Sequence, residues 1–137
     1  MLTQTPAAQP FVTAPIRNAQ EAIASHVRWL ITLQLAIRMR EPLTPRCNHA
    51  ISHPAECAIG EWLLSPSTAH LHRTPEHLAL SAHHKQFHYE MLQIATHINA
   101  LDFESAARLL NDPNGTFQAA AKATANAITT LDRTHKL

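Results

Sequence analysis

"RTPEHLALSAHHKQFHYEMLQIATHINAL", residues 73–101, carries the clearest helix start signal in the chain. Thr74 can cap a helix, Pro75 suits its first position, and Glu76 suits the positive end of the helix dipole. We expect the helix that begins here to reach about Ala100. The other predicted elements are placed around it.

Apolar residues recur at three- and four-residue spacing on both sides of this stretch. From Pro15 onward they predict a long helix with a wide buried face, which Pro42 and Pro45 end. After the central helix, the sequence predicts a brief helix over residues 102–110, capped by its aspartate, and then a turn. A last amphipathic stripe over residues 117–131 predicts the final helix.

Between the first and central helices we expect a polar loop to about His53 and then a short helix. Ser52 or His53 would cap it, Pro54 would stand near its first position, and it would run to Leu64. No segment alternates with period two, so a sheet is not expected. The predicted fold is all-α: an antiparallel four-helix bundle with one extra short helix.

Composition limits the class of protein. A chain of 137 residues with 45% hydrophobic content builds one core, and we divide it into a flexible lead-in over residues 1–14 and a single domain over residues 15–137. With 11 basic and 10 acidic residues, no basic stripe indicates nucleic-acid binding. The longest apolar run, residues 29–37, is too short to span a membrane, and no signal peptide is recognised, so we expect a cytoplasmic protein.

Histidine is strongly over-represented, with 11 residues in 137. It is the commonest metal ligand, and it also titrates near neutral pH. His84 and His88 are four apart, so on a helix their rings lie on one face and can bind one metal ion. Leu92 and Ala95 continue that face toward the interior. The alternative is a pair of surface or hydrogen-bonded core histidines.

"CAIGEWLL", residues 57–64, holds one of the two cysteines and one of the two glycines. Cys57 falls near the start of the short helix, where the helix dipole favours a thiolate, the form that binds zinc. Gly60 lets a neighbouring backbone or ring approach closely, and Trp62 can shield the site from water. The alternative is a buried structural cysteine with a packing glycine and a core tryptophan.

His26 lies one turn before Trp29, on the same face of the first helix as Leu33. Alone, it is typical of a hydrogen-bonded core residue. Together with Cys57 and the His84–His88 pair, it completes a set of three nitrogens and one sulfur from three helices. That set suits a tetrahedral zinc ion and leaves no open position for catalytic water, so we do not expect an enzyme.

Three motifs occur in order: "HVRW" at 26–29, "CAIGEW" at 57–62 and "HKQFH" at 84–88. Together they resemble the bacterial chemoreceptor zinc-binding (CZB) domain family, over about residues 16–133. The family has a Cys-x-(Leu/Ile/Phe)-Gly-x-Trp motif and a His-x2-Phe-His motif. The resemblance implies a four-helix bundle whose zinc is held by His26, Cys57, His84 and His88. Leu30 departs from the lysine that relatives often carry there.

The resemblance also implies a function. Family members are usually fused to chemoreceptor signalling modules or diguanylate cyclases, and this chain leaves no room for such an output domain. We therefore expect a stand-alone zinc sensor that acts through a homodimer or on a signalling protein in trans. A related expectation is that hypochlorous acid oxidises zinc-bound Cys57 and ejects the metal. The alternative is a metal-free helical module for protein–protein interaction; a di-iron centre would need an interior rich in glutamate.

The remaining histidines and the second cysteine are expected to lie outside the site. His83 points about 100° away from His84 on a helix, and His53 could compete for a place near Cys57. Cys47 lacks the spacing of a zinc finger and is expected to be a free thiol, with a lesser role in resolving oxidised Cys57. Six further histidines are expected on the surface or in loops: His49, His70, His72, His77, His97 and His135.

Overall fold

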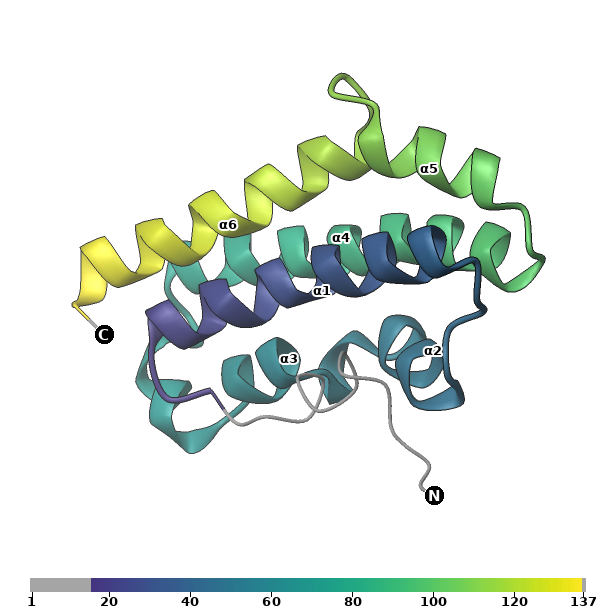
Figure 1. The fold of residues 1–137 in the computed structure, drawn as a ribbon. Coiled ribbons are helices and arrows are strands. Elements are labelled where there is room, and N and C mark those ends of the chain that lie inside the picture. The colour runs from purple at the N-terminus through teal and green to yellow at the C-terminus, as the bar shows by residue number, and fades with distance from the viewer. Residues whose placement is uncertain (1–15, 137) are drawn as a thin grey trace.

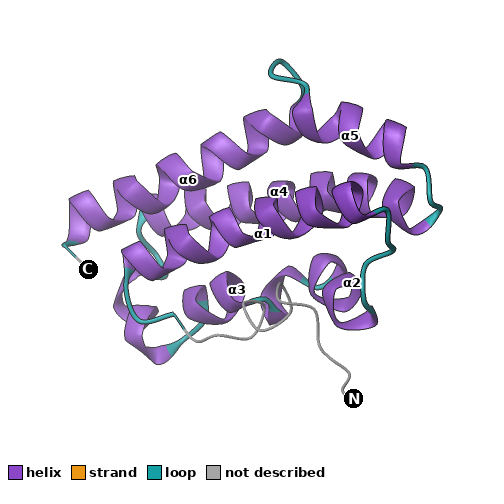
Figure 2. Ribbon diagram, viewed as in Figure 1, coloured by secondary structure: helices purple, strands orange, loops and turns teal. Residues whose placement is uncertain are grey.

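The computed structural model describes residues 16–136, and all regular structure in this range is helical (Figure 2). The predicted all-α class is therefore confirmed, whereas the predicted lead-in, residues 1–14, lies outside the described residues. The α-helices are α1 (Ala19–Met39), α2 (Pro45–Ser52), α3 (Ala58–Leu63), α4 (Pro75–Asn99), α5 (Phe103–Asn111) and α6 (Thr116–His135). Two 3-10 segments accompany them, η2 (Pro54–Glu56) and η3 (Pro66–Leu71).

The helix α4 is the centre of the arrangement, because it contacts α1, α2, α3, α5 and α6. In Figure 1, α5 and α6 run along one side of the α1–α4 pair, and the short helices α2 and α3 lie on the opposite side. Within the described chain the long helices are α1, α4 and α6, and the region from 45 to 71 is divided into short segments. The four-helix bundle is thus not confirmed in the form predicted.

Local capping signals account for the elements that were predicted well. The Thr74 hydroxyl accepts a hydrogen bond from the His77 N–H at 3.2 Å, and α4 begins at Pro75 as expected. The Asp102 carboxylate accepts from the Ser105 N–H at 3.2 Å at the start of α5. Where a side chain satisfies a free N–H in the first turn, the helix start follows from the sequence.

The predicted polar loop before residue 53 is wrong, because α2 occupies it. Thr44 caps this helix by accepting from the Cys47 N–H at 3.3 Å, and Pro45 stands at its first position. Proline ends a helix that precedes it but fits the first turn of one that follows, where its missing N–H costs nothing. Pro45 therefore starts α2 as well as following the end of α1.

The predicted start of the next helix is also wrong. Pro54 begins the 3-10 turn η2, not an α-helix, and neither Ser52 nor His53 caps α3. The cap of α3 is Cys57 itself, whose sulfur accepts from the Gly60 N–H at 3.4 Å. The cysteine thus has a structural role in starting the helix, in addition to any chemistry.

One face of α4 supplies much of the core. Its buried side chains include three with no measurable exposure that follow helical spacing: Leu80, Phe87 and Ile94. His84 and His88 lie on this face, at 2% and 1% exposure. Leu92, which was expected to continue the face, is exposed, and Met91 takes the buried position instead. None of the helices within residues 16–136 is long and apolar enough to cross a membrane.

Gly60 allows the 3-10 turn to pack directly on α3. A Cβ atom built on Gly60 would lie 1.9 Å from the Pro54 carbonyl oxygen and 2.8 Å from the Ala55 Cα. Both atoms are backbone, so neither can move aside without displacing η2. The expected close approach at Gly60 is confirmed, with a 3-10 turn rather than another long helix as the neighbour.

We predict that Gly60→Ala destabilises the protein by about 1–3 kcal/mol, the usual cost of overpacking, and displaces Cys57. Chemical denaturation of the wild type and the variant measures the loss. Gly115→Ala is the matched control, because its Cβ would meet the exposed Asp112 side chain at 3.1–3.2 Å, and that side chain can move. Equal losses in the two variants would contradict the role of the Gly60 contact.

Candidate metal centre

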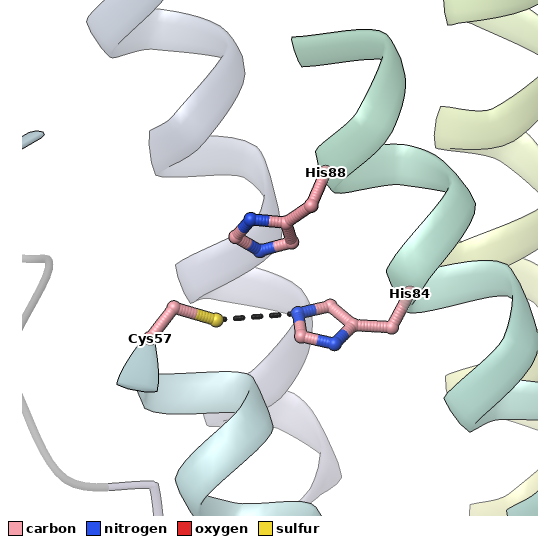
Figure 3. Close-up of side chains that lie close together, drawn as sticks. All are labelled: Cys57, His84 and His88. Carbon is pink, nitrogen blue, oxygen red and sulfur yellow. Dashed lines mark hydrogen bonds between the residues drawn. The ribbon is translucent and has the colours of Figure 1, made fainter. Parts of the chain in front are cut away.

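The side chains of Cys57, His84 and His88 converge in the interior. Their ligand atoms all lie within 4.8 Å of one another, and all three residues are buried. Figure 3 shows the cysteine at the start of α3 facing two rings that project from successive turns of α4. The spacing of four residues on α4 brings the rings together, with centroids 4.5 Å apart.

Burial of the Cys57 thiol favours its protonated form. Burial raises its pKa to about 11, although hydrogen bonds from the Gly60 and Ile59 N–H groups oppose the rise. The N–H donors at the start of α3 favour a thiolate, as expected, but loss of solvation outweighs them. A bound cation reverses this balance, since thiols that coordinate metals are deprotonated.

His84 is the partner of that thiol. Its Nε2 atom lies 3.2 Å from the Cys57 sulfur. Burial, and to a lesser extent the neighbouring His88, His26 and Lys85, lower the pKa of His84 to about 3, so the ring is neutral near pH 7. The thiol S–H accordingly donates to Nε2, whose lone pair points at the sulfur. Replacing that proton by a metal ion would keep both atoms in place.

His88 is prepared as a ligand by its backbone contact. Its Nδ1–H donates to the Ile51 carbonyl oxygen at 3.0 Å, which fixes the tautomer and leaves the lone pair on Nε2. That Nε2 atom is buried and has no hydrogen-bond partner among the described residues. Burial lowers the pKa of His88 to about 4, so the ring stays neutral near neutral pH. Protonation therefore does not supply the Nε2 atom with a hydrogen to donate. An orphaned imidazole lone pair beside a thiol is typical of a metal ligand.

These donors suit a tetrahedral ion that takes nitrogen and sulfur. With Zn–S near 2.3 Å and Zn–N near 2.0–2.1 Å, ligand atoms at tetrahedral angles are about 3.4–3.6 Å apart. The observed S···N separation of 3.2 Å is slightly shorter than these values, and the upper limit of 4.8 Å for the whole group is longer. Small side-chain shifts are enough to accommodate such an ion.

His26 lies beside this group but not within it. It is buried on α1 with Trp29 and Leu33, as predicted, and its ring centroid is 4.5 Å from that of Phe87. Its Nε2–H donates to the Ala121 carbonyl oxygen of α6 at 2.9 Å. Its Nδ1 is buried and finds no partner in the described part of the chain. His26 thus repeats the pattern of His88, with one nitrogen held by backbone and the other bare.

Other residues expected outside the site are placed as follows. His83 is exposed, which agrees with the expectation that it points away from His84. His77 was expected at the surface but is buried. Its Nε2–H donates to the Leu63 carbonyl oxygen at 2.9 Å, which satisfies that nitrogen in the interior. Cys47 is buried, and within residues 16–136 neither cysteine forms a disulfide. The tryptophan next to His88 is Trp29, with ring centroids 6.0 Å apart, and Trp62 is also buried.

A second group was missed by the sequence analysis. His49, His53 and Glu56 have ligand atoms within 4.8 Å of one another, and all three residues are exposed. The signal was present as His-x3-His-x2-Glu immediately before Cys57. It went unrecognised because residues 46–53 were expected to form a loop, in which the spacing of four carries no geometric meaning.

We predict that binding of Zn²⁺ releases one proton per ion between about pH 6 and pH 8, because the thiol is protonated while both imidazoles are already neutral. The apparent affinity should then rise about tenfold per pH unit. Competition titrations at several pH values measure the slope, after correction for the competing chelator. A flat profile would contradict a thiol that is protonated before zinc binds, and a slope of two protons would contradict neutral histidines.

Comparison with known proteins yields no relative. No protein-family model, curated protein or solved structure matches the chain. The candidate centre therefore rests on its own geometry and on the chemistry of its donors.

Proposed function

We propose that the protein is a zinc-binding sensor that acts without catalysis of its own. The observation that carries this proposal is the convergence of Cys57, His84 and the bare Nε2 of His88 in the interior. A buried polar atom without a partner lowers stability, so an ion that binds it stabilises the fold. Thiolate together with imidazole favours zinc over the hard cations, which prefer oxygen ligands.

We propose that His26 completes the coordination through Nδ1. The support is that this atom is buried and bare, and that the His26 ring packs against Phe87, the residue next to His88 on α4, with ring centroids 4.5 Å apart. Its Nε2–H contact with Ala121 would then serve as the outer hydrogen bond that orients the ring, as Ile51 does for His88. Four protein ligands leave no position for catalytic water.

We predict that Zn²⁺ at 100 times its Kd stabilises the wild type by about 2.7 kcal/mol, because only the folded state holds the site. His84→Ala should lose this stabilisation, whereas His83→Ala, which changes an exposed neighbour, should keep it. His26→Ala should bind more weakly than the wild type but still bind. Thermal denaturation with and without zinc measures the effect, alongside metal analysis of the purified protein.

Two outcomes would decide against parts of the proposal. If the wild type shows no stabilisation by zinc, the sensor is abandoned and a metal-free helical interaction module remains. If His26→Ala binds zinc as tightly as the wild type, the site has three protein ligands, and one coordination position is open.

We propose that the ion reports through the short helices. It would join the start of α3 to α4, and the His88–Ile51 contact extends that link to α2. Without the ion, the contacts of α3 to α4 depend on fewer interactions, so the surface of this side changes. We propose that a second copy of the chain, or a bacterial signalling protein in trans such as a chemoreceptor or diguanylate cyclase, receives the change. Val27 and Ile31, exposed and one turn apart on α1, are apolar positions available to such a partner.

Oxidation of Cys57 is the second signal that we propose. The Cys57 thiolate attacks the oxygen of hypochlorous acid, a sulfenic acid forms, and chloride leaves with the electron pair of the O–Cl bond. Sulfur loses two electrons and chlorine gains them. The sulfenic acid is a poor ligand, so the site loses its affinity for the ion. The pocket beside His84, about 120 Å³ and lined by Pro54 and Ala55, gives a small oxidant a route toward the centre.

We predict that one equivalent of hypochlorous acid releases zinc from the wild type, because Cys57 is the oxidisable ligand of the set. Cys57→Ser should keep weaker zinc binding through its histidines and lose this release, whereas Cys47→Ser should behave as the wild type. A chromogenic chelator follows the released zinc, and a dimedone adduct located by mass spectrometry identifies the oxidised cysteine. Release accompanied by an adduct on Cys47 alone would contradict the proposal.

A further inference from the structure

We propose that His49, His53 and Glu56 form a second, solvent-exposed site for divalent zinc, which captures the ion and delivers it to the buried centre. The capture half stands on the geometry of these three residues. The delivery half rests on the proposed function, because it requires the buried centre to bind zinc.

The three side chains already face one another. The Nε2 atom of His49 lies 2.9 Å from a carboxylate oxygen of Glu56, and the rings of His49 and His53 stack with centroids 4.1 Å apart. The histidines are four apart at the end of α2, and the 3-10 turn η2 then brings Glu56 back toward them. Two imidazoles and one carboxylate are a common donor set of zinc sites that keep an open position.

The tautomer of His53 favours binding at the surface. Its Nδ1–H donates to the His49 carbonyl oxygen at 2.8 Å, so the lone pair is on Nε2. This backbone contact is of the same kind as that between His88 and Ile51 in the buried centre. Outer contacts of this kind hold the ring of a metal-binding histidine in place.

The chain connects the two sites directly. Glu56 is followed by Cys57, the sulfur ligand of the centre. Pro54 and Ala55, which lie between His53 and Glu56, line the pocket of about 120 Å³ that His84 also lines. The pocket has room for several water molecules, and therefore for an ion that exchanges its water for protein ligands. A single 3-10 turn thus separates the exposed cluster from a path to the centre.

The two sites should differ in strength and lifetime. The exposed cluster has three ligands, no sulfur and free access to water, so it should bind weakly and exchange its ion quickly. The buried centre gains a thiolate and excludes water, so it should bind tightly and fill slowly. A fast, weak site beside a slow, tight one raises the local concentration of the ion at the entrance.

The experiment uses the full chain, stripped of metal by a chelator. Titration with Zn²⁺ counts the ions bound by the wild type, His49→Ala/Glu56→Gln and His84→Ala. The matched control is His70→Ala/Glu41→Gln, which removes one exposed histidine and one exposed glutamate elsewhere. Mixing with Co²⁺ then times the filling of the buried centre alone, because the thiolate-to-cobalt absorption band requires sulfur and the exposed cluster has none.

We expect the wild type and the control to bind one ion tightly and a second weakly. His49→Ala/Glu56→Gln should lose the weak ion, and His84→Ala should keep it. The rate of filling in His49→Ala/Glu56→Gln should fall by at least about tenfold, because the raised local concentration of the ion at the entrance is lost. The final affinity of the buried centre should be unchanged.

A wild type that binds a single ion, or a weak ion that persists in His49→Ala/Glu56→Gln, would overturn the capture site. Equal filling rates in this variant and the wild type would overturn delivery. Weak binding that survives in every variant except His49→Ala/Glu56→Gln, with no tight site in the wild type, would sustain capture and refute the proposed function instead. The two failures are therefore distinguishable.

Discussion

The contact between the Cys57 sulfur and His84 Nε2, 3.2 Å long and buried, is the interaction on which the rest of the structure depends. It joins the start of a short helix to the middle of the longest one. Both groups are neutral there, because burial raises the pKa of the thiol and lowers that of the imidazole. A neutral thiol and imidazole are inexpensive to bury, and they become a strong ligand pair when one proton leaves.

The position of that sulfur follows from one packing constraint. Because Gly60 has no side chain, the backbone of Pro54 and Ala55 can lie against α3. The turn η2 is then short enough for Cys57 to cap α3 with its sulfur while the same sulfur faces α4. Helix capping and ligand placement are thus satisfied by a single side chain, which explains why a thiol and a glycine occur three residues apart.

Signals that act over a few residues could be predicted from the sequence, and those that depend on distant packing could not. Thr74 and Asp102 mark helix starts because their hydrogen bonds close within three residues. The pairing of His84 with His88 is equally local, and Cys57 was grouped with them because it was expected to face inward from another helix. By contrast, the partner of His26 is the carbonyl of Ala121, 95 residues away, which no spacing rule anticipates. The burial of His77 likewise depends on the carbonyl of Leu63 in another element.

The division between long and short helices sets the surroundings of the candidate centre. The helices α1, α4 and α6 pack on one another through extended apolar faces, which respond little to one added ligand. The segment from α2 to α3 is also packed into the core, through buried side chains that include Ile51, Ile59 and Trp62. It meets α4 through buried polar contacts as well, among them Ile51 to His88 and Cys57 to His84. An ion bound between α3 and α4 would therefore act at these polar contacts, and the exposed cluster of His49, His53 and Glu56 lies on the same short segment.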